Sequence, residues 1–397
     1  MEQGKKTGKG KKAVIAAFLL LLFLPALLTV LSHLTRYPFD TALYGYEPPK
    51  DPVPVSISAW LGGEMQKGIA SKVESGMRPR GVLVKAYNTA NFLLFSKSER
   101  IIGKNYDIFE KEYINAELML NPADDFSREE NITSLKTFVS ELEEVNRLLK
   151  QHRKTLVVYI APSKGSLDRE NIPDKYTAMA NRDGVRCIDL FREEIRKTDV
   201  PCLICPDIAG ELEYPAFYPT GIHWSRTYEQ LCSQRVIDMI REQSGTPYGR
   251  LLLTGVKAYP GPIWRETDVL QLANVFYDPK MTCCEYETEW EDTEDYPPML
   301  RMLLQGDSFA LGLFKDLRDN TEDVQICLVT NDYSAEDWDG RVTLMRNDWE
   351  KFDWQYYLDN TDVVVVEIAE PFVKNRTYGF VSNLLARLKE YVPAEGR

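Results

Sequence analysis

Histidine and long apolar runs are scarce in this sequence of 397 residues, and basic residues are fewer than acidic ones. Lys and Arg number 48 against 60 Asp and Glu, so the formal net charge at pH 7 is −12. This acidity argues against a nucleic-acid-binding protein, because duplex binding requires a basic surface. With 44% apolar and 27% charged residues, the composition also excludes collagen-like, coiled-coil and wholly disordered chains.

Only one apolar run is long enough to cross a bilayer. Residues 13–31 carry no charge, and a helix of this length spans a hydrocarbon core of about 30 Å. Five lysines precede it, so residues 1–12 have a net charge of +4 and the remainder has −16. Because positive flanks stay in the cytoplasm, we expect a cytoplasmic basic tail over 1–12 and a transmembrane signal anchor over 13–31. The protein is then single-pass in the cell membrane with an extracellular C-terminal domain. A cleaved signal peptide is the alternative.

The seven cysteines include one C-x-x-C pair, Cys202 and Cys205, a spacing typical of zinc or redox sites. A zinc site requires two more ligands at suitable spacing. The three histidines do not lie beside a second pair of this kind. We therefore expect a disulfide or buried thiols, with no metal and no cofactor.

Beyond the apolar run, the chain divides into a linker and a domain. Residues 32–85 are rich in Pro and polar residues with little periodicity, which predicts a stalk. Residues 86–397 are expected to form one domain, in which strands and helices alternate. The strands are predicted over 156–160, 185–190, 302–305, 325–330 and 363–368, and the helices over 127–151 (capped by Ser127), 225–240 and 382–391. This alternation indicates an α/β fold whose parallel sheet is flanked by helices.

Two loops carry side chains suited to nucleophilic chemistry. Ser308 lies in a Gly-Asp-Ser-Phe turn directly after the strand at 302–305, and ligands of open α/β sheets bind beyond the carboxyl ends of strands. His223 lies just before the predicted helix at 225–240. A serine nucleophile needs a base, and imidazole suits this role near neutral pH. Taken singly, an ordinary turn and a structural histidine are the alternatives.

Five blocks together resemble the AlgX/AlgJ-type, or DHHW, proteins, which are SGNH-hydrolase-like exported proteins of polysaccharide O-acetylation. The blocks occur in the family's order, at residues 103–114, 159–164, 221–224, 306–309 and 362–370. They are similar to the family's GKDGWLF…YI, P-x-K, Asp-x-His-Trp, serine and D-VVVEI-E segments, and residues 267–270 resemble its D-DL segment. The histidine precedes the serine, unlike in ordinary SGNH hydrolases. This permutation is compatible with a triad, which is defined by geometry and not by chain order.

The resemblance implies an SGNH-hydrolase-like, flavodoxin-type parallel sheet in permuted order. It also implies that Ser308 is the nucleophile that accepts an acetyl group, that its backbone N–H is part of the oxyanion hole, and that His223 is its general base. Asp307, Trp224 and Lys164 are then expected in or beside the pocket.

The sequence departs from the family at the third member of the triad. Gly221 stands where the Asp-x-His-Trp motif has aspartate, and glycine cannot orient an imidazole. Another carboxylate can take that place, or serine and histidine can act as a dyad, or the site has lost its turnover. The candidate orienting acids are Asp207, Glu211 and Glu213.

By resemblance, the protein is an O-acetyltransferase that moves acetyl groups onto a cell-wall or extracellular polysaccharide. A membrane-bound O-acyltransferase is the expected acetyl donor, because acetyl-CoA is absent outside the membrane and a single span cannot carry the acetyl group across. The alternatives are a carbohydrate acetyl esterase, in which water is the acceptor, and an inactive glycan-binding or scaffold subunit of an acetylation complex. Whether the chain is an enzyme therefore depends on the acid that replaces Gly221.

Overall fold

The computed structural model describes residues 3–47, 52–261, 266–293, 298–331, 334–336, 342–344 and 348–393. The chain forms two compact units. The first consists of residues 1–99 and 270–278, and the second of residues 100–269 and 279–397.

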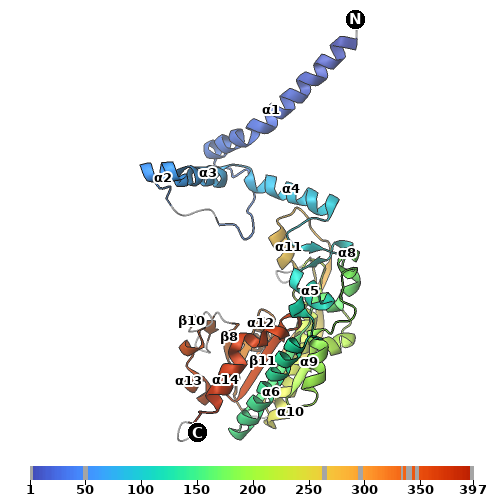
Figure 1. Ribbon diagram of the computed structural model, residues 1–397, viewed down its shortest axis with the longest axis vertical. Coiled ribbons are helices and arrows are strands. Elements are labelled where there is room, and N and C mark those ends of the chain that lie inside the picture. The colour runs from blue at the N-terminus through green and yellow to red at the C-terminus, as the bar shows by residue number, and fades with distance from the viewer. Residues whose placement is uncertain are drawn as a thin grey trace. The chain divides into compact units, whose positions relative to one another are not determined.

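The first unit is helical (Figure 1). In its helix α1 (Gln3–Thr35), the segment Lys11–Thr35 is long and apolar enough to cross a membrane, which agrees with the apolar run in the sequence. Three more helices follow, α2 (Ile57–Gly62), α3 (Glu64–Gly76) and α4 (Arg80–Phe95). The segment expected to be a stalk thus contains regular structure, and the α/β unit starts at Arg100.

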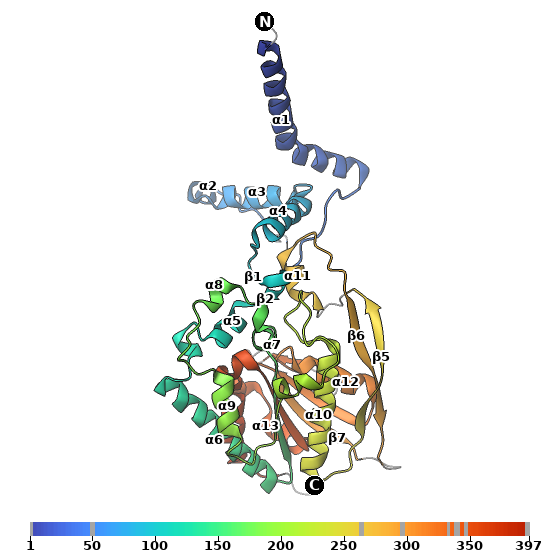
Figure 2. The same ribbon diagram turned by 90° about the vertical axis from the view of Figure 1, so that its right-hand side faces the viewer.

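The second unit is built on a central sheet that contains β7 and is flanked by helices (Figure 2). Its seven strands lie in the order β10-β9-β8-β7-β11-β3-β4. The five strands from β8 to β4 are parallel, whereas at one edge β9 pairs antiparallel with β8 and β10 pairs antiparallel with β9. The strands are β3 (Thr155–Ala161), β4 (Cys202–Ile204), β7 (Leu300–Gly306), β8 (Val324–Thr330), β9 (Ser334–Glu336), β10 (Val342–Leu344) and β11 (Val363–Ala369). The α/β class with a largely parallel sheet is confirmed.

The centre of the sheet is formed by β11 and β3. Every residue of both strands is buried, and all are apolar except Thr155 of β3 and Glu367 of β11, as expected for strands covered on both faces. Their register pairs Val365 with Val157, and β11 also pairs with β7 through Val365 and Leu304. The carboxyl ends of β7, β11 and β3 therefore meet at one edge of the sheet.

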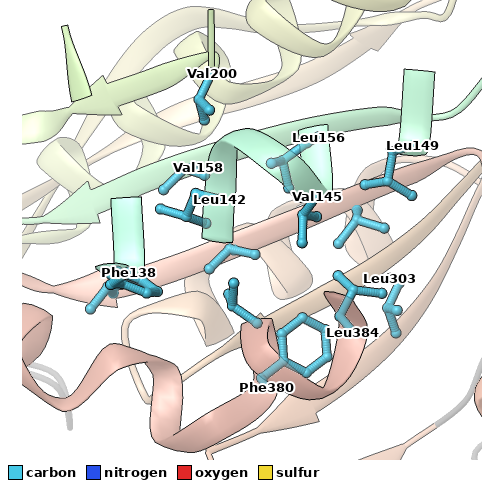
Figure 3. Packing of buried hydrophobic residues seen from close by; sticks show 14 of the residues in the cluster. Phe138, Leu142, Val145, Leu149, Leu156, Val158, Val200, Leu303, Phe380 and Leu384 are labelled. Carbon is cyan, nitrogen blue, oxygen red and sulfur yellow. The ribbon is translucent and has the colours of Figure 1, made fainter. Parts of the chain in front are cut away.

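Helices cover both faces of this sheet. One face packs against α6 (Glu129–Gln151), α9 (Cys187–Ile195), α13 (Trp354–Asp359) and α14 (Phe380–Leu388), and the other against α10 (Arg226–Ser244) and α12 (Ala310–Asn320). On the first face, Phe138 and Leu142 of α6 share one apolar cluster with Val158 of β3 and Phe380 of α14 (Figure 3). Burial of such side chains is the main stabilising contribution to the sheet-helix layers.

Shorter elements complete this unit. Its other helices and strands are β1 (Ile101–Ile102), β2 (Ile108–Phe109), α5 (Lys111–Leu118), α7 (Lys164–Leu167), α8 (Asp174–Thr177), β5 (Arg250–Pro260) and β6 (Thr282–Glu291). The 3-10 turns are η1 (Lys104–Tyr106), η2 (Pro122–Asp124), η3 (Arg169–Asn171), η4 (Cys205–Glu211), η6 (Trp349–Lys351) and η7 (Glu370–Gly379). Strands β1 with β2 and β5 with β6 form two separate antiparallel pairs. The division of the chain falls within helix α11 (Asp268–Ala273), whose first two residues belong to this unit.

Two local predictions were wrong. The strand expected at 185–190 lies in helix α9, whose buried residues Cys187, Ile188, Phe191 and Ile195 recur at helical spacing. The short apolar run was compatible with either structure, and the strand next to β3 is β4 instead. Helix α6 is present, but Ser127 does not cap it, because its hydroxyl and N–H both donate to Asp125.

Five of the seven cysteines are buried, and Cys202 and Cys205 form no disulfide with each other. Burial raises the pKa of the Cys202 and Cys205 thiols. Cys205 lies in the apolar cluster on one face of the sheet, and Cys202 packs against the apolar cluster on the other face.

A buried carboxyl joins the end of β11 to the start of α7. Glu370 accepts the backbone N–H of Ser163 at 3.0 Å and the hydroxyl of Ser166 at 2.7 Å. Ser163 is also the N-cap of α7. Burial raises the pKa of Glu370 from 4.5 to about 7, because the anion is removed from water.

Replacing Glu370 with glutamine is expected to remove one source of pH-dependent stability. Between pH 4.5 and about pH 7, Glu370 of the folded protein retains a proton that the unfolded chain has lost. The free energy of unfolding therefore falls as pH rises through this window and levels off above it. Glutamine accepts the same two hydrogen bonds without ionising. Denaturant unfolding of the full chain in detergent gives the free energy of unfolding of wild type and of Glu370→Gln. The wild-type value minus the variant value should fall by roughly 1 kcal/mol per pH unit between about pH 5 and pH 7. A difference independent of pH, or an equal effect of the exposed control Glu143→Gln, would contradict this assignment.

Candidate active site

His223 lies on a loop, residues 216–225, that folds back on itself. Phe217 and Trp224 form an antiparallel bridge, and Ser225 donates its backbone N–H to the carbonyl of Ala216 at 2.7 Å. The Ser225 hydroxyl also caps the long helix α10. Both ends of the loop are therefore fixed at the start of a largely buried helix.

The middle of the loop is fastened by Lys164, whose side chain is completely buried. Its ammonium group donates to the carbonyl oxygens of Tyr218 at 2.8 Å, Pro219 at 2.9 Å and Gly221 at 3.0 Å, and it pairs with Asp107 at 2.9 Å. Burial lowers the pKa of Lys164, and the Asp107 carboxylate opposes this effect. The structure thus places Lys164 beneath the histidine loop and not among the side chains that line the pocket.

The acid that contacts His223 is Asp268, the first residue of α11. Its Oδ2 lies 2.5 Å from His223 Nδ1, and its Oδ1 accepts the backbone N–H groups of Ile222 at 3.1 Å and Val269 at 2.7 Å. An ionised carboxylate only accepts hydrogen bonds, so Nδ1 carries the proton of the neutral imidazole and Nε2 is an acceptor. This is the tautomer that a general base requires.

Ser308 is exposed in the turn between β7 and α12. Its Oγ lies 2.7 Å from His223 Nε2, within the reach that proton transfer requires. Ser308, His223 and Asp268 therefore form a continuous hydrogen-bonded relay, although they come from three separate segments of the chain.

The serine turn is held from below by Glu367 of β11, whose Oε2 accepts the backbone N–H of Asp307 at 2.8 Å. Asp307 in turn accepts the N–H of Phe309 at 2.9 Å. A Cβ atom on Gly306 would lie 2.6 Å from Glu367 Oε2, so this approach requires glycine. Burial, together with the charge of Asp307, raises the pKa of Glu367.

Two aromatic rings pack behind the histidine. The ring of Phe309 lies 5.0 Å from the imidazole of His223 and 5.5 Å from the ring of Trp224. Trp224 is buried, and its indole N–H donates to Glu229 at 3.1 Å. Trp224 therefore supports the rings beside the site and does not line the pocket.

The three carboxylates expected to orient His223 lie elsewhere. Asp207, Glu211 and Glu213 are all exposed. Asp207 and Glu211 form ion pairs with arginine side chains at distances from 2.7 to 3.4 Å. The position next to the imidazole is filled by Asp268, so this expectation is corrected.

Ser308 and Asp307 line a pocket of about 630 Å³, a volume within the range of small-molecule sites. Its wall is largely apolar and aromatic, with a few polar side chains. The other lining residues are Glu110, Glu112, Tyr113, Ile222, Phe309, Leu311, Thr330, Asn331, Phe372 and Tyr378. Over the described part of the chain, no group of three or more His, Cys, Asp or Glu is arranged to hold a metal ion.

Sequence reasoning overlooked the roles of several residues at this site. Asp268 lies in the segment that resembles the family's D-DL block, and that block was the one available signal for it. Asp107 and Glu367 likewise lie in the family-like blocks at 103–114 and 362–370, but the blocks alone did not indicate which residues they contact. Asn331 lies outside every block and carried no signal of this kind.

Removing the buried ammonium group is expected to release the histidine loop. Lys164→Met leaves Asp107 as an unpaired buried charge, so we expect a loss of about 3–5 kcal/mol in the free energy of unfolding. We also expect weakening of the downfield proton NMR signal of the His223–Asp268 hydrogen bond. The double variant Asp107→Asn with Lys164→Met should recover part of the stability but not the NMR signal, whereas the exposed control Lys150→Met should change neither. An unchanged His223 signal in Lys164→Met would show that Lys164 does not position the loop.

Comparison with known proteins identifies the family. A family model described as the SGNH hydrolase-like domain of the acetyltransferase AlgX matches residues 120–339, which include Ser308, His223 and Asp268. Among solved structures, the chain is similar to the O-acetyltransferase domain of Pseudomonas putida AlgJ (16% identity, 74% of this chain and 99% of that chain, TM-score 0.45). It is also similar to Pseudomonas aeruginosa AlgX (14%, 73% and 67%, TM-score 0.42) and to Bacillus cereus PatB1 with a sulfonyl adduct (13%, 63% and 93%, TM-score 0.41). No curated protein matches the sequence. Because the family model covers more than half of its length, the chain belongs to the AlgX family of SGNH hydrolase-like acetyltransferase domains.

Proposed function

We propose that this chain is an exported, membrane-anchored O-acetyltransferase that acts on a cell-wall or extracellular polysaccharide. The observation that carries the proposal is the relay from Ser308 Oγ through His223 to Asp268, with contacts of 2.7 and 2.5 Å. The serine faces a pocket large enough for a sugar unit. Membership of the AlgX family supports the same chemistry.

The reaction proceeds through an acetyl-serine intermediate. His223 Nε2 takes the proton of the Ser308 hydroxyl while Oγ attacks the carbonyl carbon of the donor's acetyl ester. The tetrahedral intermediate then collapses, and the donor oxygen leaves with the proton from His223. In the second half-reaction, a sugar hydroxyl gives its proton to His223 and attacks the acetyl carbon. The bond to Oγ breaks, and Ser308 regains a proton.

The negative charge of each tetrahedral intermediate requires preorganised donors. The backbone N–H of Ser308 is one proposed donor, close to the positive N-terminal end of α12. The side-chain amide of Asn331 is the other. Asn331 lines the pocket, and its Oδ1 accepts from Gln305 Nε2 at 2.5 Å. This contact sets the orientation of the amide and leaves its NH₂ group as the donor.

The N-terminal helix supports membrane anchoring. The segment Lys11–Thr35 can span a bilayer, and the lysines that precede it favour a cytoplasmic N-terminus. The α/β unit then lies outside the membrane, where the acetyl group has to be delivered. We propose a membrane-bound O-acyltransferase as the donor partner.

An acetyl esterase is the second candidate. Ser308 is exposed, so water can replace the sugar as the acceptor in the second half-reaction. The inactive scaffold was favoured by the glycine at position 221, which cannot orient His223. Asp268 contacts His223 instead, which supports an active site over a scaffold.

Ser308→Ala is expected to abolish turnover of an acetyl ester. The full chain in detergent should cleave a chromogenic acetyl ester, and mass spectrometry should detect one acetyl group on Ser308. The rate of ester cleavage should fall by about 10³-fold or more in the variant. Acetylated sugar formed after addition of an oligosaccharide identifies a transferase, and acetate alone identifies an esterase. Equal rates for wild type and Ser308→Ala, with Ser127→Ala as the matched control, would sink the enzyme proposal.

Asp268→Asn is expected to lower kcat for the ester by about 10³–10⁴-fold, because asparagine cannot enforce the Nδ1–H tautomer or stabilise the imidazolium. The exposed control Asp207→Asn should change kcat by less than about twofold. The reverse ranking of these two variants would return the orienting role to the segment around Asp207.

A further inference from the structure

Acidic side chains line the pocket beside Ser308, and none of the described residues that line it is basic. Glu110, Glu112 and Asp307 line it, and no lysine or arginine among the described residues does so. Glu110 forms an ion pair with Arg100, but Arg100 does not line the pocket. Glu112 lies in the exposed first turn of α5, so its carboxylate faces solvent at the pocket.

This charge pattern disfavours anionic ligands. A site that binds sugar carboxylates or phosphates characteristically offers arginine or lysine donors. Here a uronate unit would meet carboxylates at short range, within a chain whose net charge after residue 12 is −16. Like charges at a ligand site oppose binding and slow encounter.

One wall of the pocket carries an aromatic side chain on a strained turn. Arg376, Thr377 and Tyr378 have consecutive φ angles of 52°, 55° and 50°, a left-handed conformation that side chains rarely adopt. Such strain persists only where the surroundings impose it, and it is concentrated at functional sites.

The surroundings of this turn do impose it. Arg376 pairs with Glu141 at 3.1 Å, and the indole N–H of Trp349 donates to the carbonyl of Tyr378 at 3.2 Å. The Tyr378 hydroxyl accepts from the Asn375 amide at 2.8 Å. The ring itself remains 38% exposed and lines the pocket. The turn therefore holds an exposed aromatic ring in a fixed position at the wall.

We propose that this pocket binds an acceptor glycan without carboxylate or phosphate groups, built from neutral or amino sugars. Tyr378 provides a platform for the apolar face of a sugar ring, and Glu112 accepts hydrogen bonds from sugar hydroxyl or ammonium groups. The inference rests on the proposed function for its acceptor role, but the binding preference can be tested without turnover.

The test uses the full-length Ser308→Ala protein in detergent and measures binding of three oligosaccharides of equal length by calorimetry. One is neutral, one carries amino groups and one is a polyuronate. We expect the neutral and amino oligomers to bind at least about tenfold more tightly than the uronate oligomer. Equal affinities or tightest binding of the uronate oligomer would overturn the proposal, and so would the absence of binding by all three.

Variants test the two named side chains. Glu112→Lys should weaken the amino oligomer relative to the neutral one by about threefold to tenfold and should improve the uronate oligomer. The same charge change at the exposed Glu143 of α6 should not alter these ratios. Tyr378→Ala should weaken the neutral oligomer by about tenfold, whereas Tyr378→Phe should retain most of the affinity. Unchanged ratios in Glu112→Lys together with unchanged affinity in Tyr378→Ala would contradict the proposal.

Transfer of acetyl groups by the wild-type protein completes the test. Acceptor preference in transfer should follow the binding order. If ester cleavage independent of Ser308 shows that the proposed function is wrong, the binding order still decides the ligand class. If transfer depends on Ser308 but favours the uronate oligomer, the acceptor inference alone fails.

Discussion

One buried ammonium group determines where the histidine of this site lies. Lys164 has no access to solvent, and it satisfies its charge with Asp107 and with three carbonyl oxygens of the loop that carries His223. Asp268 holds the same loop from its other side by accepting the N–H of Ile222. The Lys164 ammonium group thus binds carbonyl oxygens of the loop, and the Asp268 carboxylate binds one of its N–H groups. The imidazole is therefore positioned before any substrate binds. Such preorganisation is the main way in which a protein lowers a barrier for acyl transfer.

Buried acids perform a related task at the carboxyl end of the sheet. Glu367 lies in β11 and Glu370 directly follows it, and burial raises the pKa of each. Glu367 supports the turn that presents Ser308, and Glu370 fixes the start of the helix that contains Lys164. The central strand therefore connects the serine turn with the support of the histidine loop through short polar contacts in a dry environment, where hydrogen bonds are strong and unpaired groups are costly.

The sheet could be predicted from sequence because its central strands are rich in apolar and β-branched residues, as in the four valines from Val363 to Val366, and such runs are typical of buried parallel strands. The segment at 185–190 was ambiguous, since six residues do not separate the period of a strand from that of a helix. The serine and histidine could be proposed from their loops and the family order of the blocks. Asp268 could not be assigned, because it lies 45 residues from His223 and only the folded chain brings α11 to the loop.

The close approach at Gly306 restricts how this site can change. A side chain at that position would meet Glu367 Oε2 and Ala310 Cβ, each at 2.6 Å, so a larger residue requires simultaneous changes on β11 and α12. The nucleophile turn therefore tolerates substitution at Gly306 poorly. New acceptor specificities in descendants of this chain are accordingly expected to arise at the pocket wall around Glu112 and Tyr378, where side chains border open space, while the turn that holds the serine stays the same.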